Sequence, residues 1–224
     1  MCGIVGYVGK AEAVPLLLHG LKKLEYRGYD SAGIAIVEPH LHVFKTQGRI
    51  ADLEALLTED VPQGTLGIGH TRWATHGKPS WENAHPHCDC SGQIAIVHNG
   101  IIENYLELRK ELEGEGHVFH SETDTEVVSH LVEKYYDGDL CCAVQAAIAH
   151  LKGSYALAVV SNRHPNELIA VRQDSPLVIG VGEGEYYLAS DIPALLDVTR
   201  TAYVLEDGQV AQITRASVVV YGQQ

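Results

Sequence analysis

The chain starts with the sequence MCGIVG at residues 1–6, so a cysteine directly follows the initiator methionine. If an aminopeptidase removes Met1, Cys2 carries a thiol and a free α-amine on one residue. A free α-amine has a pKa of about 7.7–8.0, so part of it is neutral near pH 7 and can accept the thiol proton. Nucleophile and base are then present together. The alternative is a start codon followed by a small buried residue that opens a strand.

Outward from this segment, apolar runs rich in β-branched residues alternate with helical patterns. Strands are predicted at residues 4–8, 33–37, 42–46, 66–71, 94–98, 155–161, 168–172, 178–181, 186–189, 202–205 and 210–214, with an edge strand or an exit linker at 217–221. Helices are predicted at residues 13–24, 50–57, 103–112, 124–136, 140–151 and 192–196. This order predicts an α+β fold in which two largely antiparallel sheets pack together with helices outside. We expect one domain over residues 1–224.

Composition narrows the classes of function. The chain has 224 residues, 46% of them hydrophobic, and a formal net charge of −13, which argues against binding to nucleic acid or to an anionic membrane. No run approaches the roughly 18 apolar residues that span a bilayer, and Lys10 and Glu12 interrupt the apolar start. Five cysteines, with Cys141 and Cys142 adjacent, make a poor disulfide framework. We therefore expect a cytoplasmic protein with reduced thiols.

Four segments are dense in glycine and polar residues where a packed core would be apolar. They are CGIVG at 2–6, YRGYDSAG at 26–33, HTRWATHG at 70–77 and HNGIIEN at 98–104. Two of them directly follow a predicted buried strand. Such segments are candidates for a site at strand ends.

Together with NAHPH at 83–87 and SETDTE at 121–126, these segments resemble, in order, the glutaminase domain of class II glutamine amidotransferases. They are most similar to the amino-terminal half of the glucosamine-6-phosphate synthases, and the resemblance covers about residues 2–221. It implies the four-layer αββα sandwich of amino-terminal nucleophile hydrolases, with no cofactor. It also implies that the isomerase half of those enzymes, which binds the sugar phosphate, lies outside these residues as a C-terminal partner domain.

The reaction that the resemblance implies is hydrolysis of the side-chain amide of L-glutamine, with Cys2 as nucleophile. The developing oxyanion needs preorganised donors, each worth about 3–4 kcal/mol. By resemblance, Asn99 offers its side-chain amide and Gly100 its backbone N–H. The alternative for Asn99-Gly100 is a type I′ hairpin turn, which the dipeptide alone favours.

Free glutamine is a zwitterion, so its recognition requires a cation and an anion. Arg72 can hold the α-carboxylate in a bidentate fork, and Asp124 can hold the α-ammonium; the family pattern supports both. It also places Trp73, Thr75 and His76 in the loop that covers the substrate. The alternatives are a surface arginine in an ion pair and a helix N-cap at Asp124, which can also serve both roles.

Arg27 resembles a family position near the nucleophile, which gives it an orienting role; the alternative is a structural salt bridge. His70, His76, His85 and His98 suggest a Cys–His pair. The terminal amine makes that pair unnecessary, and the family uses no histidine as the base.

A metal site is not expected. HPHCDC at residues 85–90 has residue types that bind zinc, but it forms one tight cluster without a second pair at ligand spacing. Asp89 and Cys90 lie where the family pattern stops being informative, so a variable loop is predicted there. GVGEG at 180–184 lacks the Lys-Ser/Thr ending of a phosphate loop and predicts a hairpin turn. EDG at 206–208 predicts a second hairpin.

Three functions remain open. The leading one is glutamine hydrolysis through a γ-glutamyl thioester on Cys2, with the ammonia passed on for glucosamine 6-phosphate synthesis from fructose 6-phosphate. Another is the glutaminase half of an amidophosphoribosyltransferase or asparagine synthetase, against which the YDS and WATH sequences argue. The third is a glutamine sensor without turnover. A homo-oligomer is compatible with each.

Overall fold

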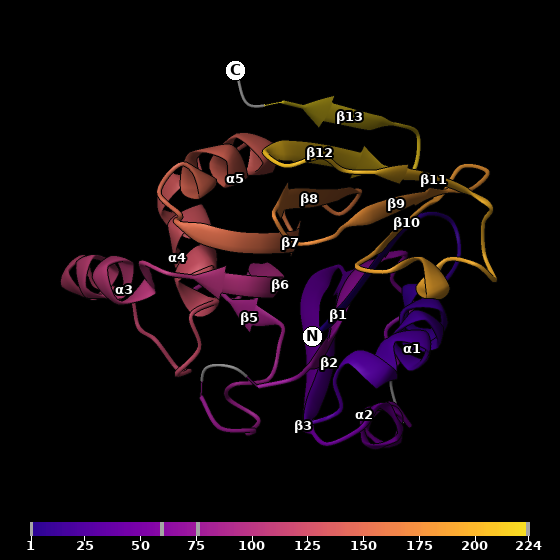
Figure 1. The fold of residues 1–224 in the computed structure, drawn as a ribbon, viewed down its shortest axis with the longest axis horizontal. Coiled ribbons are helices and arrows are strands. Elements are labelled where there is room, and N and C mark those ends of the chain that lie inside the picture. Colours follow the sequence, from indigo (N-terminus) through magenta and orange to yellow (C-terminus); the bar gives the residue numbers. More distant parts are fainter. Residues whose placement is uncertain (1, 59–60, 75–76, 223–224) are drawn as a thin grey trace.

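Two antiparallel sheets lie against each other at the centre of the molecule (Figure 1). The computed structural model describes residues 2–58, 61–74 and 77–222. The seven-stranded sheet has the order β11-β9-β10-β1-β4-β2-β3, and the six-stranded sheet has the order β13-β12-β8-β7-β6-β5. The strands are β1 (Gly3–Val8), β2 (Ser31–Glu38), β3 (His40–Gln47), β4 (Leu66–Arg72), β5 (His87–Cys88), β6 (Ile94–Ile102), β7 (Gly153–Ser161), β8 (Glu167–Gln173), β9 (Val178–Val181), β10 (Tyr186–Ala189), β11 (Thr201–Val204), β12 (Gln209–Thr214) and β13 (Val218–Tyr221).

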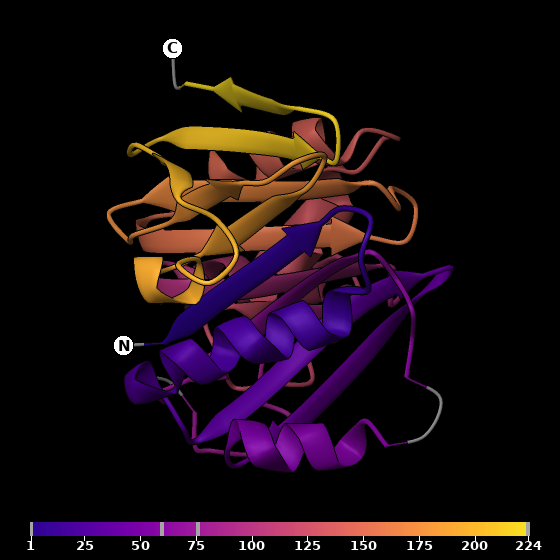
Figure 2. The same cartoon turned by 90° about the vertical axis from the view of Figure 1, so that its right-hand side faces the viewer.

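Helices cover the outer face of each sheet. The α-helices are α1 (Ala13–Leu24), α2 (Ile50–Leu56), α3 (Tyr105–Gly114), α4 (Glu126–Tyr135) and α5 (Leu140–Ile148), and two short 3₁₀ helices are η1 (Glu25–Arg27) and η2 (Ile192–Ala194). Helices α1 and α2 lie on the seven-stranded sheet (Figure 2), while α3, α4 and α5 lie beside the other sheet. The four-layer αββα sandwich expected from the sequence is confirmed.

Three apolar clusters fill the three interfaces between these layers. The central cluster joins the sheets through residues such as Ile4, Val97 and Leu168, all almost fully buried. The other two clusters hold the helices against the outer faces. Since burial of apolar surface is the main force for such packing, central strands such as β1 and β7 are buried on both faces.

Glycines on β4 let α1 approach the sheet closely. A Cβ added at Gly67 would lie 2.9 Å from Leu17 Cδ1, and one at Gly69 would lie 3.1 Å from Leu21 Cδ1. Leu17 and Leu21 are four residues apart and share the buried face of α1. The apolar spacing that predicts this helix therefore also describes its contact with β4.

The hairpin predicted at EDG, residues 206–208, is wrong. Strand β11 pairs with β9 in the seven-stranded sheet, whereas β12 pairs with β8 and β13 in the other sheet. Leu205 is fully buried and donates its backbone N–H to Leu177 O, so it anchors the chain as it passes between the sheets. The predicted hairpin between β9 and β10 is confirmed, and residues 218–221 form an edge strand.

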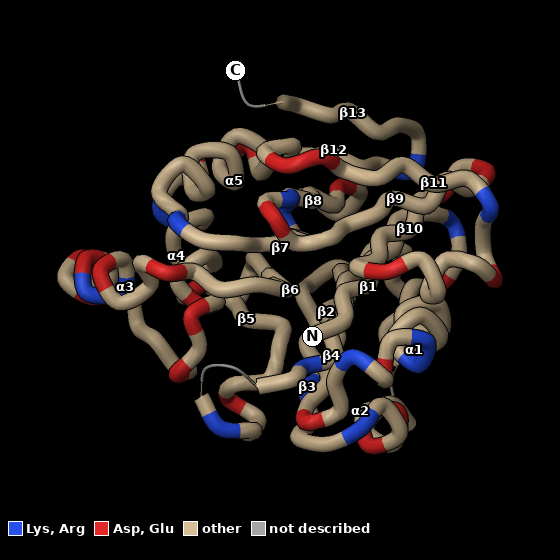
Figure 3. The backbone as a smooth tube through the Cα atoms, viewed as in Figure 1, with Lys and Arg blue, Asp and Glu red and all other residues tan. Residues whose placement is uncertain are grey.

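Charged residues are concentrated in helices and connections, and β1, β6 and β7 carry none (Figure 3). Within the described residues, no helix has both the length and the apolar character to cross a membrane. Cys2 precedes β1, Arg72 ends β4 and Asn99 lies on β6, so the candidate site residues meet where the two sheets adjoin.

Candidate active site

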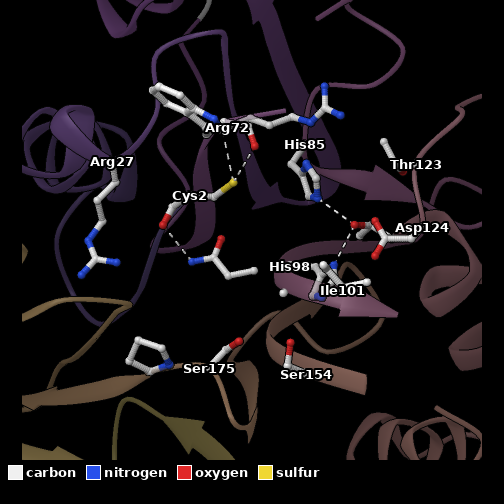
Figure 4. Close-up of a pocket in the computed structure, with 15 residues that line it drawn as sticks. Cys2, Arg27, Arg72, His85, His98, Ile101, Thr123, Asp124, Ser154 and Ser175 are labelled. Atoms are coloured by element: carbon white, nitrogen blue, oxygen red, sulfur yellow. Dashed lines mark hydrogen bonds between the residues drawn. The ribbon is translucent and has the colours of Figure 1, made fainter. Parts of the chain in front are cut away.

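A cavity of about 300 Å³ opens at the ends of β1, β4 and β6 (Figure 4). It is lined by Cys2, Arg27, Arg72, Trp73, His85, His98, Asn99, Gly100, Ile101, Thr123, Asp124, Thr125, Ser154, Ser175 and Pro176. The volume is at the lower end of the range of about 300–1,000 Å³ found for small-molecule sites. Every described residue that the sequence placed in the site is part of this lining. Thr75 and His76 lie outside the described residues.

The Cys2 thiol is fixed by the backbone of the next segment of the site. Trp73 N–H donates to Cys2 Sγ over 3.2 Å, and the thiol lies 3.5 Å from Trp73 O. Burial raises the pKa of the Cys2 thiol, although the bond from Trp73 N–H and the nearby Arg72 guanidinium act in the opposite direction. The thiol therefore keeps its proton at neutral pH, and a base must remove that proton before the sulfur can attack.

Hydrogen bonds at both ends of its amide orient Asn99. Asn99 Nδ2 donates to Cys2 O over 3.0 Å, and Asn99 Oδ1 lies 3.0 Å from His70 Nε2. His70 Nε2 also lies 3.0 Å from the carbonyl oxygen of His98. Since a carbonyl oxygen can only accept, His70 Nε2 carries the proton and donates to both. The Asn99 amide nitrogen is thereby directed toward Cys2.

Burial lowers the pKa of His70 to about 3, so this side chain is neutral at physiological pH. His70 thus holds Asn99 in place, a role that the sequence did not suggest. The hydrogen-bond partners of the Cys2 thiol named above are backbone atoms of Trp73 rather than a histidine.

Gly100 lies inside β6, opposite Tyr155 of β7, and does not form a hairpin turn. The turn that the Asn99-Gly100 dipeptide favours is therefore wrong. Gly100 has a φ of +127°, and an added Cβ would lie 2.0 Å from Ser154 O. Glycine is required here both for its backbone conformation and for the close approach of β7.

Asp124 and Cys2 lie on opposite sides of the cavity (Figure 4). Asp124 is buried, and its Oδ2 accepts a hydrogen bond from Ile102 N–H over 2.8 Å. The N-cap residue of α4 is Thr125, so an N-cap role for Asp124 is wrong. No Lys, Arg or His among the described residues forms an ion pair with the Asp124 carboxylate.

Arg72 is 4% exposed, so it is not a surface arginine. Its Nη2 donates to Gly77 O over 3.2 Å and its Nη1 to Lys78 O over 3.4 Å. Burial lowers the pKa of Arg72, while the charges of Asp30, Cys2 and Asp124 raise it. The guanidinium thus remains a cation at one wall of the cavity.

Arg27 occupies the same side of the site as Cys2 (Figure 4), and Trp73 also lines the cavity. Arg27 Nη2 lies 2.5 Å from Asp191 Oδ2, so the salt bridge considered for it is present while Arg27 still lines the cavity. Trp73 is half-exposed, and its ring meets Tyr29 edge to face at 5.5 Å. This position at the mouth suits a residue that covers a bound ligand.

Asp30 is a site residue that the sequence did not single out. Its carboxylate accepts a hydrogen bond from Ala74 N–H, and its own backbone N–H donates to Arg72 O over 3.1 Å. These bonds hold the turn that presents Trp73 N–H to Cys2. Asp30 is part of the YDSAG sequence, which could have pointed to it. The sequence did not show, however, that its carboxylate contacts Ala74 N–H.

Residues 85–87 are buried and His85 lines the cavity, whereas Asp89 and Cys90 lie in the turn between β5 and β6, where Cys90 is exposed. His85 stacks on His70 at 4.0 Å, and His85 Nε2 lies 3.0 Å from Thr125 Oγ1. His87 Nε2 lies 3.1 Å from Thr123 Oγ1. Burial lowers the pKa of His85 and His87 well below the usual value. These neutral rings form the floor beneath the cavity.

A family model described as the glutamine amidotransferase domain matches residues 70–197, which is more than half of the chain. The chain belongs to the glutamine amidotransferase family. The matched range includes the oxyanion candidates and both candidate groups for the glutamine zwitterion. The family expected from the sequence is thus confirmed.

Curated relatives of this glutamine amidotransferase domain are much longer than the chain. It is 55% identical over its full length to glutamine–fructose-6-phosphate aminotransferase (isomerizing) of Clostridium tetani, and spans 37% of that protein. It is 59% identical to the protein of the same name from Symbiobacterium thermophilum, over 98% of the chain and 36% of that protein.

A solved structure, glutamine phosphoribosylpyrophosphate amidotransferase from B. subtilis, superposes on 99% of the chain and 49% of its own, with a TM-score of 0.84 and 30% identity. This similarity also supports the fold of amino-terminal nucleophile hydrolases expected from the sequence.

Proposed function

We propose that this glutamine amidotransferase domain hydrolyses the side-chain amide of L-glutamine to glutamate and ammonia, with Cys2 as nucleophile. The observation that carries the proposal is the orientation of Asn99, whose amide nitrogen His70 directs toward Cys2. A preorganised donor beside a thiol is the arrangement that stabilises the oxyanion of acyl transfer. Gly100, on the same strand, supplies the second N–H in this proposal.

Proton transfer begins at the terminus of the chain. After removal of Met1, which lies outside the described residues, the α-amine of Cys2 takes the thiol proton. The raised pKa of the thiol explains why such a base is needed. The sulfur then bonds to the amide carbon, and the negative charge moves to the carbonyl oxygen near Asn99.

Collapse of this intermediate breaks the carbon–nitrogen bond. The protonated α-amine gives its proton to the leaving nitrogen, and ammonia departs while a γ-glutamyl thioester remains on Cys2. Water, deprotonated by the same amine, attacks the thioester and releases glutamate with a regenerated thiol. One glutamine and one water thus yield one glutamate and one ammonia, and no cofactor is involved.

The ends of the glutamine backbone are held by groups of opposite charge. In our proposal Arg72 binds the α-carboxylate and Asp124 binds the α-ammonium, with Trp73, Thr75 and His76 covering the ligand. The buried Asp124 carboxylate forms no ion pair among the described residues, so it favours an incoming ammonium, because burial makes a charge without a close counter-charge costly. Arg27 forms a salt bridge with Asp191, which holds Arg27 in the cavity wall near Cys2.

The ammonia is used elsewhere in the longer protein. The names of the similar proteins from Clostridium tetani and Symbiobacterium thermophilum point to fructose 6-phosphate as acceptor, and the chain spans only 37% and 36% of those proteins. We therefore propose a C-terminal isomerase domain as partner, with glucosamine 6-phosphate as product, in a homo-oligomer. None of the five cysteines, all described, forms a disulfide, which supports a cytoplasmic location.

Labelling with an electrophilic glutamine analogue such as diazo-oxo-norleucine tests nucleophile and substrate together. We expect one label on Cys2, located by mass spectrometry of peptides, and a glutamate assay that shows turnover. Cys2→Ala should lose both label and turnover while retaining the circular-dichroism spectrum, and Cys142→Ser should lose neither. Full glutaminase activity of Cys2→Ala would refute the assignment. Glutamine binding without glutamate release by the intact protein would identify a sensor instead.

A further inference from the structure

Four side chains of metal-binding type converge beside α4, outside the lining of the catalytic cavity. They are Cys90, His117, His130 and Glu133. Cys90 lies in the turn between β5 and β6, and His117 lies in the connection between α3 and α4. His130 and Glu133 are three residues apart on α4 and share one face of that helix. Figure 1 shows α4 beside β5 and close to the connection from α3.

The ligand atoms of this cluster are spaced as around a tetrahedral ion. His117 Nδ1 and His130 Nδ1 are 3.3 Å apart, and Cys90 Sγ lies 3.7 Å from the first and 3.5 Å from the second. Glu133 Oε2 lies 3.1 Å from His117 Nδ1 and 3.5 Å from His130 Nδ1. Tetrahedral zinc bonds of about 2.0–2.3 Å separate ligand atoms by about 3.3–3.6 Å.

We propose that Cys90, His117, His130 and Glu133 bind one Zn²⁺ ion. A thiolate and two imidazoles favour zinc over Mg²⁺ or Ca²⁺, which prefer oxygen ligands. A thiolate and a carboxylate carry two negative charges, which the ion neutralises. All four coordination positions come from the protein, as in structural zinc sites rather than catalytic ones.

A second carboxylate lies behind the histidine ligand. If His130 Nδ1 binds the metal, its Nε2 must carry the proton, and this atom lies 3.7 Å from Glu126 Oε1. Glu126 is itself fixed, because its carboxylate accepts hydrogen bonds from the backbone N–H groups of His120 and Ser121 and from the Ser121 hydroxyl. A carboxylate behind a metal-bound imidazole is the usual second shell of zinc histidines.

An ion pair between protonated His117 and Glu133 is the competing interpretation. It accounts for the 3.1 Å distance between them, but it leaves His130 unexplained. His130 is 1% exposed, its Nε2 has no hydrogen bond, and its Nδ1 lies 3.3 Å from the ring nitrogen of His117. A central cation gives both rings the same partner, and so explains why both direct Nδ1 inward.

The ion would join three separate segments of the chain around α4. Asp124 and Thr125, which line the catalytic cavity, directly precede this helix. Zinc at the far side of α4 therefore fixes the element on which the proposed ammonium-binding group is carried.

Metal content of the purified, untagged protein tests the proposal. After incubation with one equivalent of ZnSO₄ and gel filtration, mass spectrometry of the metals should give about one zinc per chain. Cys90→Ser and His117→Gln should each lose most of this zinc and the rise in melting temperature that zinc produces. The matched controls are Cys142→Ser and His120→Gln, which change exposed residues of the same types outside the cluster and should retain both.

X-ray absorption of the zinc-loaded wild type provides a test that does not depend on folding of the variants. We expect one sulfur neighbour at about 2.3 Å and three nitrogen or oxygen neighbours at about 2.0–2.1 Å. Absence of bound zinc in the wild type would overturn the proposal. So would equal zinc in wild type and cluster variants, or a coordination shell without sulfur.

Discussion

The hydrogen bond from His70 to Asn99 connects a buried, neutral histidine to the proposed oxyanion site. Both acceptors of His70 Nε2 are oxygens, so the ring cannot reverse its role without losing one of them. Without this donor, the Asn99 amide is free to rotate by half a turn. Its oxygen, rather than its nitrogen, would then face Cys2 in part of the population.

His70→Leu tests this connection. We expect kcat for glutamine hydrolysis to fall about three- to tenfold, which matches the loss of one hydrogen bond of about 0.5–1.5 kcal/mol. Asn99→Ala should cost about 10²–10³-fold in kcat, because it removes the proposed oxyanion donor itself. In the double variant the two losses should not add, and His70→Gln, which retains a donor, should recover part of the rate. Fully additive losses would show that His70 does not act through Asn99.

Asp124→Asn separates charge from hydrogen bonding at the proposed ammonium site. The asparagine side chain can still accept from Ile102 N–H, so the local structure is retained. Loss of a charge-assisted hydrogen bond of about 1.5–3 kcal/mol predicts a rise in KM for glutamine of about 10- to 150-fold. Steady-state kinetics measures this, with exposed Asp137→Asn as control. An unchanged KM would exclude Asp124 from substrate binding.

At the level of the element, strand β6 contains the Asn99-Gly100 dipeptide, which on its own favours a turn. Gly100 takes a positive φ and allows Ser154 O to approach, so β6 continues past the Asn99-Gly100 dipeptide to Ile102. The local sequence favours a turn, but pairing with β7 overrides that preference.

Gly100→Ala should destabilise the fold more than a glycine substitution at a comparable φ. Gly138 has a φ of +119° and nothing within 4 Å of an added Cβ, so Gly138→Ala reports backbone strain alone. We expect about 1–3 kcal/mol for Gly138→Ala and a larger loss for Gly100→Ala, measured by urea unfolding. Equal losses would mean that β6 and β7 can separate at no cost.

Elements with regular apolar spacing could be predicted well from the sequence. Leu17 and Leu21 mark the buried face of α1, and its predicted bounds match the structure. The path of the chain near Leu205 could not be predicted, because a short connection between two sheets has the same turn residues as a hairpin. Strand β5 has only two residues, so no alternation of apolar and polar residues can be recognised in its sequence.

The candidate site could be predicted through its motifs but not through its contacts. Resemblance placed Cys2, Arg72 and Asp124 at one cavity, where the structure brings them together. The cluster at Cys90 and His130 was missed, because its members are separated by 40 residues and meet through the fold rather than through a ligand spacing.

At the scale of the whole molecule, three neutral histidines beneath the cavity couple stability to pH. Burial lowers the pKa of His70 to about 3, and burial also lowers those of His85 and His87 well below 6.5. The unfolded chain takes up protons on these residues as pH falls through 6.5, whereas the folded chain does not. Their contribution to stability is thus fully present above pH 6.5 and is lost as pH falls toward the folded values.

We expect the free energy of unfolding to fall between pH 7.5 and 5.5 by about 1 kcal/mol for each such histidine, or by a few kcal/mol for the three together. Urea unfolding at both pH values measures this change. His87→Gln should remove about a third of it, while His40→Gln, at an exposed position, should leave it unchanged. A free energy that stays constant across this range would show that the rings protonate inside the folded protein.

The proposed nucleophile Cys2 precedes a strand of one sheet, and the proposed oxyanion donor Asn99 belongs to a strand of the other. Slippage of the two sheets past each other would therefore misalign sulfur and amide without disturbing either locally. The rate of glutamine hydrolysis should therefore depend on how rigidly the two sheets pack against each other. Apolar substitutions in the central cluster between the sheets leave every side chain of the site intact. We expect them to lower the rate of hydrolysis in proportion to the packing that they remove.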